Sequence, residues 1–298
     1  MEFNNVCVIG GSGFVGCHIV HLLTARGACV RVPTRNRERA KELILLPTVE
    51  VVEADVHNPS ALAGLLEGMD AVINLVGILH EVRRGDFQQV HAELPGKVVD
   101  AAKSAGVRRL LHMSALNAAP DGPSVYLRTK GEAEQRVRES GLDWTLFRPS
   151  VIFGREDSFL NLFARLLRAL PVVALARPGA RFQPVFVEDV ARAFVQSLDL
   201  PETIGQSHDL CGPKVYTLRE LVEYVGRLVG RERPIIGLGD GLSYLQAFAM
   251  ELLPVKLMTR DNLDSMKLDS VCGCDFPAEF DFQPTAMEAV VPQYLSED

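Results

Sequence analysis

Residues 123–135 place a tyrosine and a lysine, Tyr126 and Lys130, four positions apart. On a helix these two side chains project from the same face, because four residues make slightly more than one turn. An isolated tyrosine has a pKa of about 10 and needs a nearby cation before it can exchange a proton at neutral pH. Tyr126 and Lys130 are therefore either a proton-transfer pair or two ordinary residues on one helix face, and the surrounding elements decide between these readings.

Alternating apolar and amphipathic segments predict the elements that position this pair. Apolar runs predict strands at 6–10, 29–33, 49–55, 71–78, 109–115 and 144–154. Amphipathic segments predict helices at 14–26, 60–69, 94–106 and 127–140, and the charged segment 35–43 is also predicted to be helical. Such alternation implies a parallel sheet with right-handed crossovers and helices on both faces. We predict an α/β fold with a doubly wound, Rossmann-type sheet.

The pattern changes after residue 154. An amphipathic helix is predicted at 158–171, a strand followed by a helix at 183–198, and one more strand at 208–212. Thr217 and Glu220 have the spacing of a capping box at the start of a helix over 218–229. We predict two units, namely a Rossmann domain formed by 1–154 and 183–212, and a smaller, partly helical substrate or partner lobe formed by 155–182 and 213–298.

A glycine-rich segment directly follows the first predicted strand and runs into a helix. Its glycines, Gly10, Gly11, Gly13 and Gly16, fit two dinucleotide-binding spacings at once. Glycine is needed there because the turn is tight and the backbone must approach a diphosphate, which then meets the free amides of the helix N-terminus. A glycine-rich turn without a ligand is the alternative, but the strand before the segment and the helix after it favour a nucleotide.

Two arginines at the end of the second predicted strand bear on the choice of cofactor. An acidic residue at this point would bind the ribose 2′-hydroxyl of NAD, whereas arginine accommodates the 2′-phosphate of NADP. Arg35 and Arg37 stand there, and no acidic residue falls between Gly16 and Glu38. A solvated basic helix start is the alternative. We expect the Rossmann domain to bind NADP(H) in preference to NAD(H).

Residues at the ends of other strands extend the predicted cofactor site. Asp55 follows the third strand, where a carboxylate can accept a hydrogen bond from the adenine amino group. Asn74 and Gly77, towards the end of the fourth strand, lie beside the expected cofactor path, and Asn74 alone could equally form a turn. From these positions and the glycine segment, the predicted cofactor contacts are Gly10, Gly11, Ser12, Gly13, Phe14, Val15, Gly16, Arg35, Arg37, Asp55, Val56, Asn74, Val76, Gly77, Pro149, Val151 and Ile152.

The motifs together resemble the short-chain dehydrogenase/reductase superfamily, in its extended and atypical branches. The resemblance spans nearly the whole chain through "GGSGFVG", "ADV", "INLVG", "HMSAL", "YLRTK", "FRPSVIFG" and "PVFVEDVA", in that order. The segments "RNRERAK", "HMSALNA", "YLRTKGEAE" and "RFQPVFVEDVA" look most like the nucleotide-binding accessory subunit of respiratory complex I and its bacterial relatives. That group binds NADPH tightly and is not known to turn over a substrate. Neighbouring branches include NAD-dependent sugar-nucleotide epimerases and dehydratases.

This resemblance implies roles for three residues. In the family's reductases the residue matching Tyr126 exchanges a proton with the substrate oxygen, and the one matching Lys130 lowers the tyrosine pKa and holds the nicotinamide ribose. Ser114 matches the serine that polarises the carbonyl, and like Lys130 it is expected beside the cofactor. Tyr126 follows Ser114 by only twelve positions, closer than is usual for the extended enzymes. Ser124 therefore competes for the serine role, and turnover stays open.

Composition argues against several other classes of function. The net charge of −7 disfavours a nucleic-acid partner, because phosphate binding needs a basic surface. The histidines do not converge with other ligands, and Cys272 and Cys274 lack a second pair nearby, so we assign no metal site. The six cysteines are expected to be reduced thiols in a cytoplasmic protein.

The sequence also bears on location. The N-terminus has no pattern of a secretory signal, and no uncharged run approaches the roughly 20 residues that span a bilayer. The apolar stretch 244–258 is either a docking face for a membrane-associated protein complex or a core helix of the small lobe. We expect a cytoplasmic protein, either free or peripheral at the inner face of the membrane.

Three functions are consistent with these residues. The first is an NAD(P)-binding protein that prefers NADPH, keeps the nucleotide as a structural component and docks to such a complex. The second is an NADPH-dependent reductase or sugar-nucleotide epimerase/dehydratase that uses Ser114, Tyr126 and Lys130 on a carbonyl or sugar-nucleotide substrate. The third is a regulator that senses the ratio of NADP to NADPH without catalysis.

Overall fold

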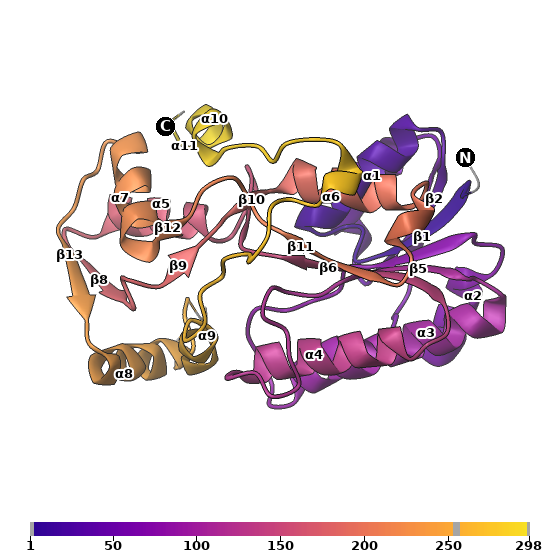
Figure 1. Cartoon of the computed structure of the whole chain (residues 1–298), viewed down its shortest axis with the longest axis horizontal. Helices are drawn as coiled ribbons and strands as arrows, with labels where there is room; N and C mark the ends of the chain where they lie inside the picture. Colours follow the sequence, from indigo (N-terminus) through magenta and orange to yellow (C-terminus); the bar gives the residue numbers. More distant parts are fainter. Residues whose placement is uncertain (1–2, 253–256, 297–298) are drawn as a thin grey trace.

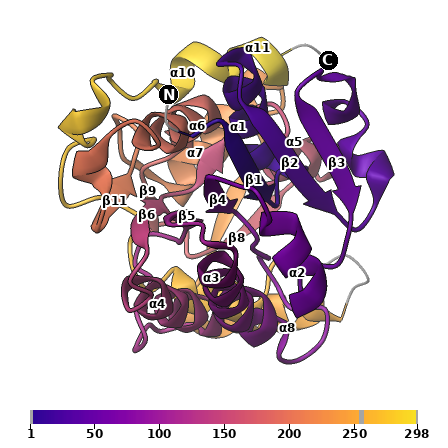
Figure 2. The same ribbon diagram turned by 90° about the vertical axis from the view of Figure 1, so that its right-hand side faces the viewer.

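The computed structural model describes residues 3–252 and 257–296. Seven strands form one sheet in the order β11-β6-β5-β4-β1-β2-β3 (Figures 1 and 2). The strands are β1 (Asn5–Ile9), β2 (Cys29–Thr34), β3 (Val49–Glu53), β4 (Ala71–Asn74), β5 (Arg109–Met113), β6 (Asp143–Pro149) and β11 (Gln206–Leu210). All neighbouring pairs are parallel. The predicted doubly wound α/β class is confirmed.

Helices cover both faces of this sheet, as Figure 1 shows from the side. One face carries α1 (Phe14–Ala25) and α6 (Val187–Ser197), and the other carries α2 (Pro59–Leu66), α3 (Leu94–Ala105) and α4 (Val125–Arg138). Side chains alternate along a strand, so β1 sends Val6 and Val8 into the core of the first face. Cys7 and Ile9 enter the core of the second face. The continuous apolar run of β1 results from this burial on both sides.

The charged segment 35–43 differs from its prediction. It forms two 3₁₀ turns, η1 (Arg37–Ala40) and η2 (Leu43–Leu45), instead of a longer helix. Only Ala40 and Leu43 are buried in these turns, so the segment lacks the apolar stripe that stabilises an α-helix by packing. The Asn36 side chain accepts a hydrogen bond from the Glu38 amide at 2.9 Å and fixes the first turn.

Two predicted strands are also shorter than expected. The fourth ends at Asn74, and the chain continues as a loop to η3 (Gln88–Glu93). The sixth is interrupted after Pro149, where the chain leaves the main sheet and forms β7 (Ile152–Phe153) against β10 (Val185–Phe186). The interruption places residues 150 and 151 at the carboxyl edge of the sheet, where β6 ends.

The small lobe lies beside this edge, at the left in Figure 1. It contains α5 (Leu160–Ala169), β8 (Val173–Ala176), β9 (Arg181–Phe182), β12 (Tyr216–Thr217), α7 (Leu218–Leu228), β13 (Ile235–Leu238), α8 (Asp240–Glu251) and α9 (Arg260–Ser265). After α9 the chain runs back to α6, where it forms η5 (Ala278–Phe280), and then returns to the small lobe at α10 (Met287–Val290) and α11 (Pro292–Leu295). The short turn η4 (Pro201–Thr203) lies earlier in the chain, directly before β11. The predicted capping box of Thr217 and Glu220 opens α7.

Phe163, Leu167, Leu221 and Val225 belong to a separate apolar core in this lobe, between α5 and α7. Within the described residues, no helix is both long and apolar enough to cross a membrane.

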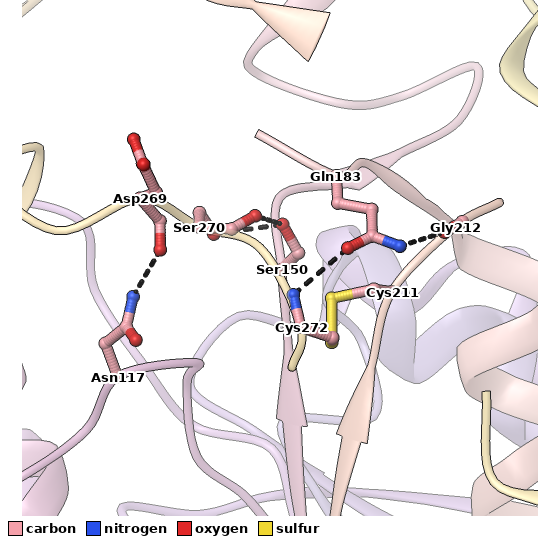
Figure 3. Close-up of a disulfide and its surroundings, with 8 residues drawn as sticks. All are labelled: Asn117, Ser150, Gln183, Cys211, Gly212, Asp269, Ser270 and Cys272. Carbon is pink, nitrogen blue, oxygen red and sulfur yellow. Dashed lines mark hydrogen bonds between the residues drawn. A yellow bond between two sulfur atoms is a disulfide. The ribbon is translucent and has the colours of Figure 1, made fainter. Parts of the chain in front are cut away.

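The expectation that all cysteines are reduced is wrong for two of them. Cys211, directly after β11, forms a disulfide with Cys272, and their Cα atoms lie 6.1 Å apart (Figure 3). The two residues are separated by 61 positions along the chain, so their spacing in the sequence gives no sign of the pairing. The fold brings them together because the segment after α9 passes over the end of β11. Cys7, Cys17, Cys29 and Cys274 are free.

Candidate nucleotide-binding site

The turn between β1 and α1 needs glycine at specific positions. A Cβ on Gly16 would lie 2.3 Å from the Gly10 carbonyl oxygen, so α1 packs directly on the turn. Gly10 has φ +87°, a left-handed conformation that glycine adopts without strain. No side chain caps the N-terminus of α1 at Gly13, which leaves its first amides free for an anion. The turn, with Ser12, Phe14 and Val15 among its residues, fits a diphosphate.

Arg35 and Arg37 lie beside this turn, at the carboxyl end of the neighbouring strand β2. Arg35 follows β2 directly and Arg37 begins η1, and both side chains are exposed. Neither guanidinium is paired with a carboxylate in the part of the chain that the structure describes. Their charge is thus free to meet a phosphate.

The other predicted contacts follow the ends of β3, β4 and β6. Asp55 is exposed, and its Oδ1 accepts a hydrogen bond from the His57 amide at 3.0 Å, with Val56 between them. Asn74 is buried, and its Oδ1 accepts from the Val76 amide at 3.3 Å, so it shapes the turn after β4. Pro149, Val151 and Ile152 lie where the chain leaves the sheet at the end of β6.

Lys130 joins this edge of the sheet to α4. Ser124 begins that helix, its hydroxyl accepting a hydrogen bond from the Leu127 amide at 3.1 Å. Lys130 is 3% exposed, and its Nζ donates to the Met113 carbonyl at the end of β5 at 3.0 Å. Burial lowers the pKa of Lys130 to about 8. A Cβ on Gly77 would lie 3.3 Å from Nζ, so a larger residue there would require the ammonium to move by a few tenths of an ångström.

Tyr126 lies one turn before Lys130 in an aromatic setting. Its ring meets those of His91 and Phe87 edge-on, with centroids 5.2 and 5.9 Å apart. Burial, with a smaller effect of the Asp261 carboxylate, raises the pKa of Tyr126 to about 12. The structure therefore holds the tyrosine firmly in its protonated form, opposite to the shift that a catalytic base requires.

The Ser114 hydroxyl points towards a buried carboxylate. It donates to Glu134 Oε1 at 2.6 Å, and Arg148 Nε donates to the same oxygen at 2.7 Å. Arg138 Nη2 donates to Glu134 Oε2 at 2.8 Å. The hydrogen bond to Glu134 raises the pKa of Arg148. Ser124 caps the helix, and its hydroxyl oxygen accepts hydrogen bonds from the Leu127 amide and from Ser265 Oγ.

His91 and Glu134 are the site residues that sequence reasoning missed. His91 Nε2 accepts a hydrogen bond from the Ile78 amide at 2.9 Å, and Nδ1 lies 3.3 Å from Thr129 Oγ1. Burial and the nearby Lys130 ammonium lower the pKa of His91 to about 2, so the ring is neutral. Glu134 follows Lys130 by one helical turn, a spacing that could have revealed it. His91 has no comparable local signal, since its position depends on the path of the loop after β4.

Comparisons with known proteins agree with this geometry. Residues 10–159 match the model of a family described as NAD(P)H-binding. The chain is 32% identical over 299 residues to the NADH dehydrogenase (ubiquinone) 1 alpha subcomplex subunit 9, mitochondrial, of Mus musculus, a match covering 94% of this chain and 77% of that protein. This chain belongs to the NAD(P)H-binding family. The resemblance to short-chain dehydrogenases/reductases and to the complex I accessory subunit is confirmed.

Other proteins that are similar to this chain in sequence or in structure include enzymes. An NAD(P)H azoreductase of Xenophilus azovorans is 27% identical over 76% of this chain and 74% of its own length. The crystal structure of a dTDP-glucose 4,6-dehydratase double mutant from Streptomyces venezuelae, with NAD bound, matches with a TM-score of 0.76. That match covers 97% of this chain and 95% of the dehydratase at 19% identity, and it shows the fold alone. The match to the NAD(P)H-binding family supports a nicotinamide dinucleotide as the cofactor of this chain.

Proposed function

We propose that this protein binds NADP(H) in preference to NAD(H) and keeps it as a structural component. The preference is supported by Arg35 and Arg37, whose exposed guanidinium groups lie beside the glycine turn and suit a 2′-phosphate. The glycine turn would hold the diphosphate and Lys130 the nicotinamide ribose. The nucleotide then completes the carboxyl edge of the sheet, between the predicted Rossmann domain (1–154 and 183–212) and the smaller lobe.

The observation that carries a structural role is the hydrogen bond from Ser114 to Glu134, 2.6 Å long. A reductase of this family needs a serine hydroxyl facing the substrate carbonyl, whereas this hydroxyl is held by a buried carboxylate that is itself paired with Arg148. Tyr126 has a raised pKa of about 12, which disfavours proton transfer near neutral pH. The engaged Ser114 hydroxyl and the raised pKa of Tyr126 therefore favour a nucleotide that is bound without turnover.

A membrane-associated complex is the proposed partner, as the name of the mouse relative suggests. The α8 helix supports this, because Leu245 and Phe248 are 62% and 46% exposed while Ala247 is buried. The stretch 244–258 thus supplies both a packed face and an exposed apolar face, although residues 253–256 lie outside the described residues. The protein would then be cytoplasmic and peripheral at the inner face of the membrane. A pull-down that recovers no membrane-complex subunit would count against this partner.

Mass spectrometry of the nucleotide released from purified, undialysed protein tests the structural role. We expect NADP or NADPH at close to one equivalent per chain, because a structural nucleotide dissociates slowly. NAD(H) in its place would contradict the cofactor preference. Protein that is folded but empty would contradict the structural role.

A soluble NADPH-dependent reductase is the second candidate, favoured by Tyr126 and the lowered pKa of Lys130 on one helix face. The azoreductase relative supports the same reading. If a substrate screen detects NADPH consumption, Tyr126→Phe should abolish it while leaving cofactor binding largely intact. Consumption that persists unchanged in Tyr126→Phe would exclude this tyrosine as the proton donor.

A further inference from the structure

Residues 259–272, called here the strap, connect the small lobe to the carboxyl edge of the main sheet (Figure 1). The strap begins with α9, which contacts the start of α4. The Asp261 carboxylate accepts hydrogen bonds from the amides of Val125 at 2.6 Å and Tyr126 at 3.2 Å. Ser265 Oγ lies 2.8 Å from Ser124 Oγ, the cap of the same helix. One end of the strap therefore positions the helix that carries Tyr126 and Lys130.

The other end of the strap crosses the loops at the nicotinamide side of the site (Figure 3). Asn117, in the loop after β5, donates to the Asp269 carbonyl at 2.8 Å. Ser150, directly after β6, donates to the Ser270 carbonyl at 2.8 Å. Ser150 stands between Pro149 and Val151, two of the predicted cofactor contacts. The strap thus touches the backbone that is expected to face the nicotinamide.

The disulfide closes this end of the strap. Cys272 is joined to Cys211 after β11, and the Cys272 amide donates to Gln183 Oε1 at 3.0 Å. Gln183 Nε2 in turn donates to the Gly212 carbonyl at 2.7 Å (Figure 3). Within the described residues this bond is the one covalent link between the strap and the sheet edge besides the chain itself. Opening it leaves the strap held by noncovalent contacts alone, among them the ion pair of Asp269 with Arg181 and the packing of Leu263 in the small lobe.

The two sulfurs differ in their access to solvent. Cys211 is 4% exposed, whereas Cys272 is half-buried, so an external thiol can reach the Cys272 sulfur first. Cys274 is free and exposed two positions further on. Desolvation and the carboxylate of Asp209 raise the pKa of the Cys274 thiol, which keeps it protonated and a poor nucleophile. The disulfide therefore resists exchange with its neighbour and opens to an external reductant.

We propose that the Cys211–Cys272 disulfide is a redox-sensitive latch, whose reduction by a dithiol loosens the strap and weakens binding of the nicotinamide dinucleotide. This inference rests on the NADP(H) binding proposed above. A thiolate of the dithiol attacks the Cys272 sulfur and Cys211 leaves as a thiolate, which takes up a proton. The second dithiol sulfur then attacks the mixed disulfide and releases Cys272 as a thiol. The protein gains two electrons and two protons, and the dithiol becomes a disulfide.

The test compares NADPH affinity of the full chain before and after treatment with dithiothreitol, by fluorescence titration. Alkylation should count four free thiols before treatment and six after it. We expect reduction to weaken binding about fivefold or more, the lower end of the range for coupled sites. Cys274→Ser, which keeps the latch, should respond as the wild type does. Cys272→Ser should bind NADPH as weakly as the reduced wild type does, and its affinity should not change with dithiothreitol.

Equal affinity of the four-thiol and six-thiol forms would overturn the latch and leave the proposed function standing. Six free thiols in protein treated with a disulfide oxidant would overturn it as well. Absence of NADPH binding in both forms would instead overturn the proposed function. If Cys272→Ser fails to fold, the oxidised and reduced wild type still allow NADPH affinity to be compared with and without the disulfide.

Discussion

Glu134 organises the buried polar groups beneath the candidate site. Its carboxylate, 1% exposed, accepts hydrogen bonds from Ser114, Arg138 and Arg148, which come from the ends of β5 and α4 and from β6. A buried ion of this kind is stable only with its partners in place, because desolvation of a lone charge is costly. The same carboxylate withdraws the Ser114 hydroxyl from the substrate side.

Replacing Glu134 should therefore destabilise the fold. Glu134→Gln leaves the partly buried Arg148 guanidinium without its counter-ion, and we expect a loss of about 3 kcal/mol in the free energy of unfolding, measured in urea. Glu139→Gln, at an exposed position near the end of the same helix, should stay within about 0.5 kcal/mol of the wild type. Equal stability of Glu134→Gln and Glu139→Gln would show that the buried cluster contributes nothing.

Lys130 predicts a dependence of stability on pH. Burial lowers its pKa from 10.5 in the unfolded chain to about 8 in the folded one. Between these values the unfolded state binds more protons, so stability rises with pH and the cost of burying the ammonium is removed. Relative to Lys130→Met, the wild type should gain up to roughly 3 kcal/mol between pH 8 and 10.5, by denaturation at each pH. If the difference in unfolding free energy between the wild type and Lys130→Met does not change over this pH range, the ammonium is not buried as described.

At the scale of elements, the turn from β1 to α1 depends on the absence of a side chain at Gly16. Gly16→Ala places a Cβ 2.3 Å from the Gly10 carbonyl oxygen, so α1 must move away from the turn. We expect NADPH binding to be lost in a titration. Gly64→Ala is the matched control, because nothing lies within 4 Å of its Cβ and alanine favours the α2 helix. Binding that survives in Gly16→Ala would contradict the assignment of this turn to the diphosphate.

Helices and strands whose own residues show a clear apolar or glycine pattern were predictable from the sequence. The apolar run of β1 and the glycines after it predicted a strand, a turn and a helix that the structure contains. The helical prediction for 35–43 was wrong because charge alone does not supply an apolar face, and only Ala40 and Leu43 are buried there. The early end of β4 at Asn74 likewise depends on a hydrogen bond to the Val76 amide after the strand.

Contacts between segments far apart in the chain could not be predicted from local sequence patterns. Ser114 and Tyr126 could be named from their motifs, but the direction of the Ser114 hydroxyl depends on Glu134, twenty positions further on. The contact of Asp261 with Tyr126 spans 135 positions, and the disulfide spans 61. Local patterns thus identify candidate site residues, while the tertiary fold decides what those residues contact.

At the scale of the whole molecule, the chain passes between the sheet and the small lobe several times. After α9 the strap returns to the sheet edge, and η5 then packs beside α6 through Phe280 (Figure 1). The nucleotide-binding edge therefore lies under a segment fixed at both ends. The α8 helix, with Leu242 and Leu245 exposed, lies next to α9 at the lower left of Figure 1, away from α1 and the glycine turn.

Calorimetric titration of the purified chain with NADPH and with NADH tests the central claim most directly. A hydrogen bond to a charged phosphate contributes roughly 1.5–3 kcal/mol, so we predict that NADPH binds at least about tenfold more tightly. The double variant of Arg35→Ala and Arg37→Ala should remove most of that difference and retain binding of NADH. Absence of heat with both nucleotides, in protein first stripped of any bound nucleotide, would contradict the account.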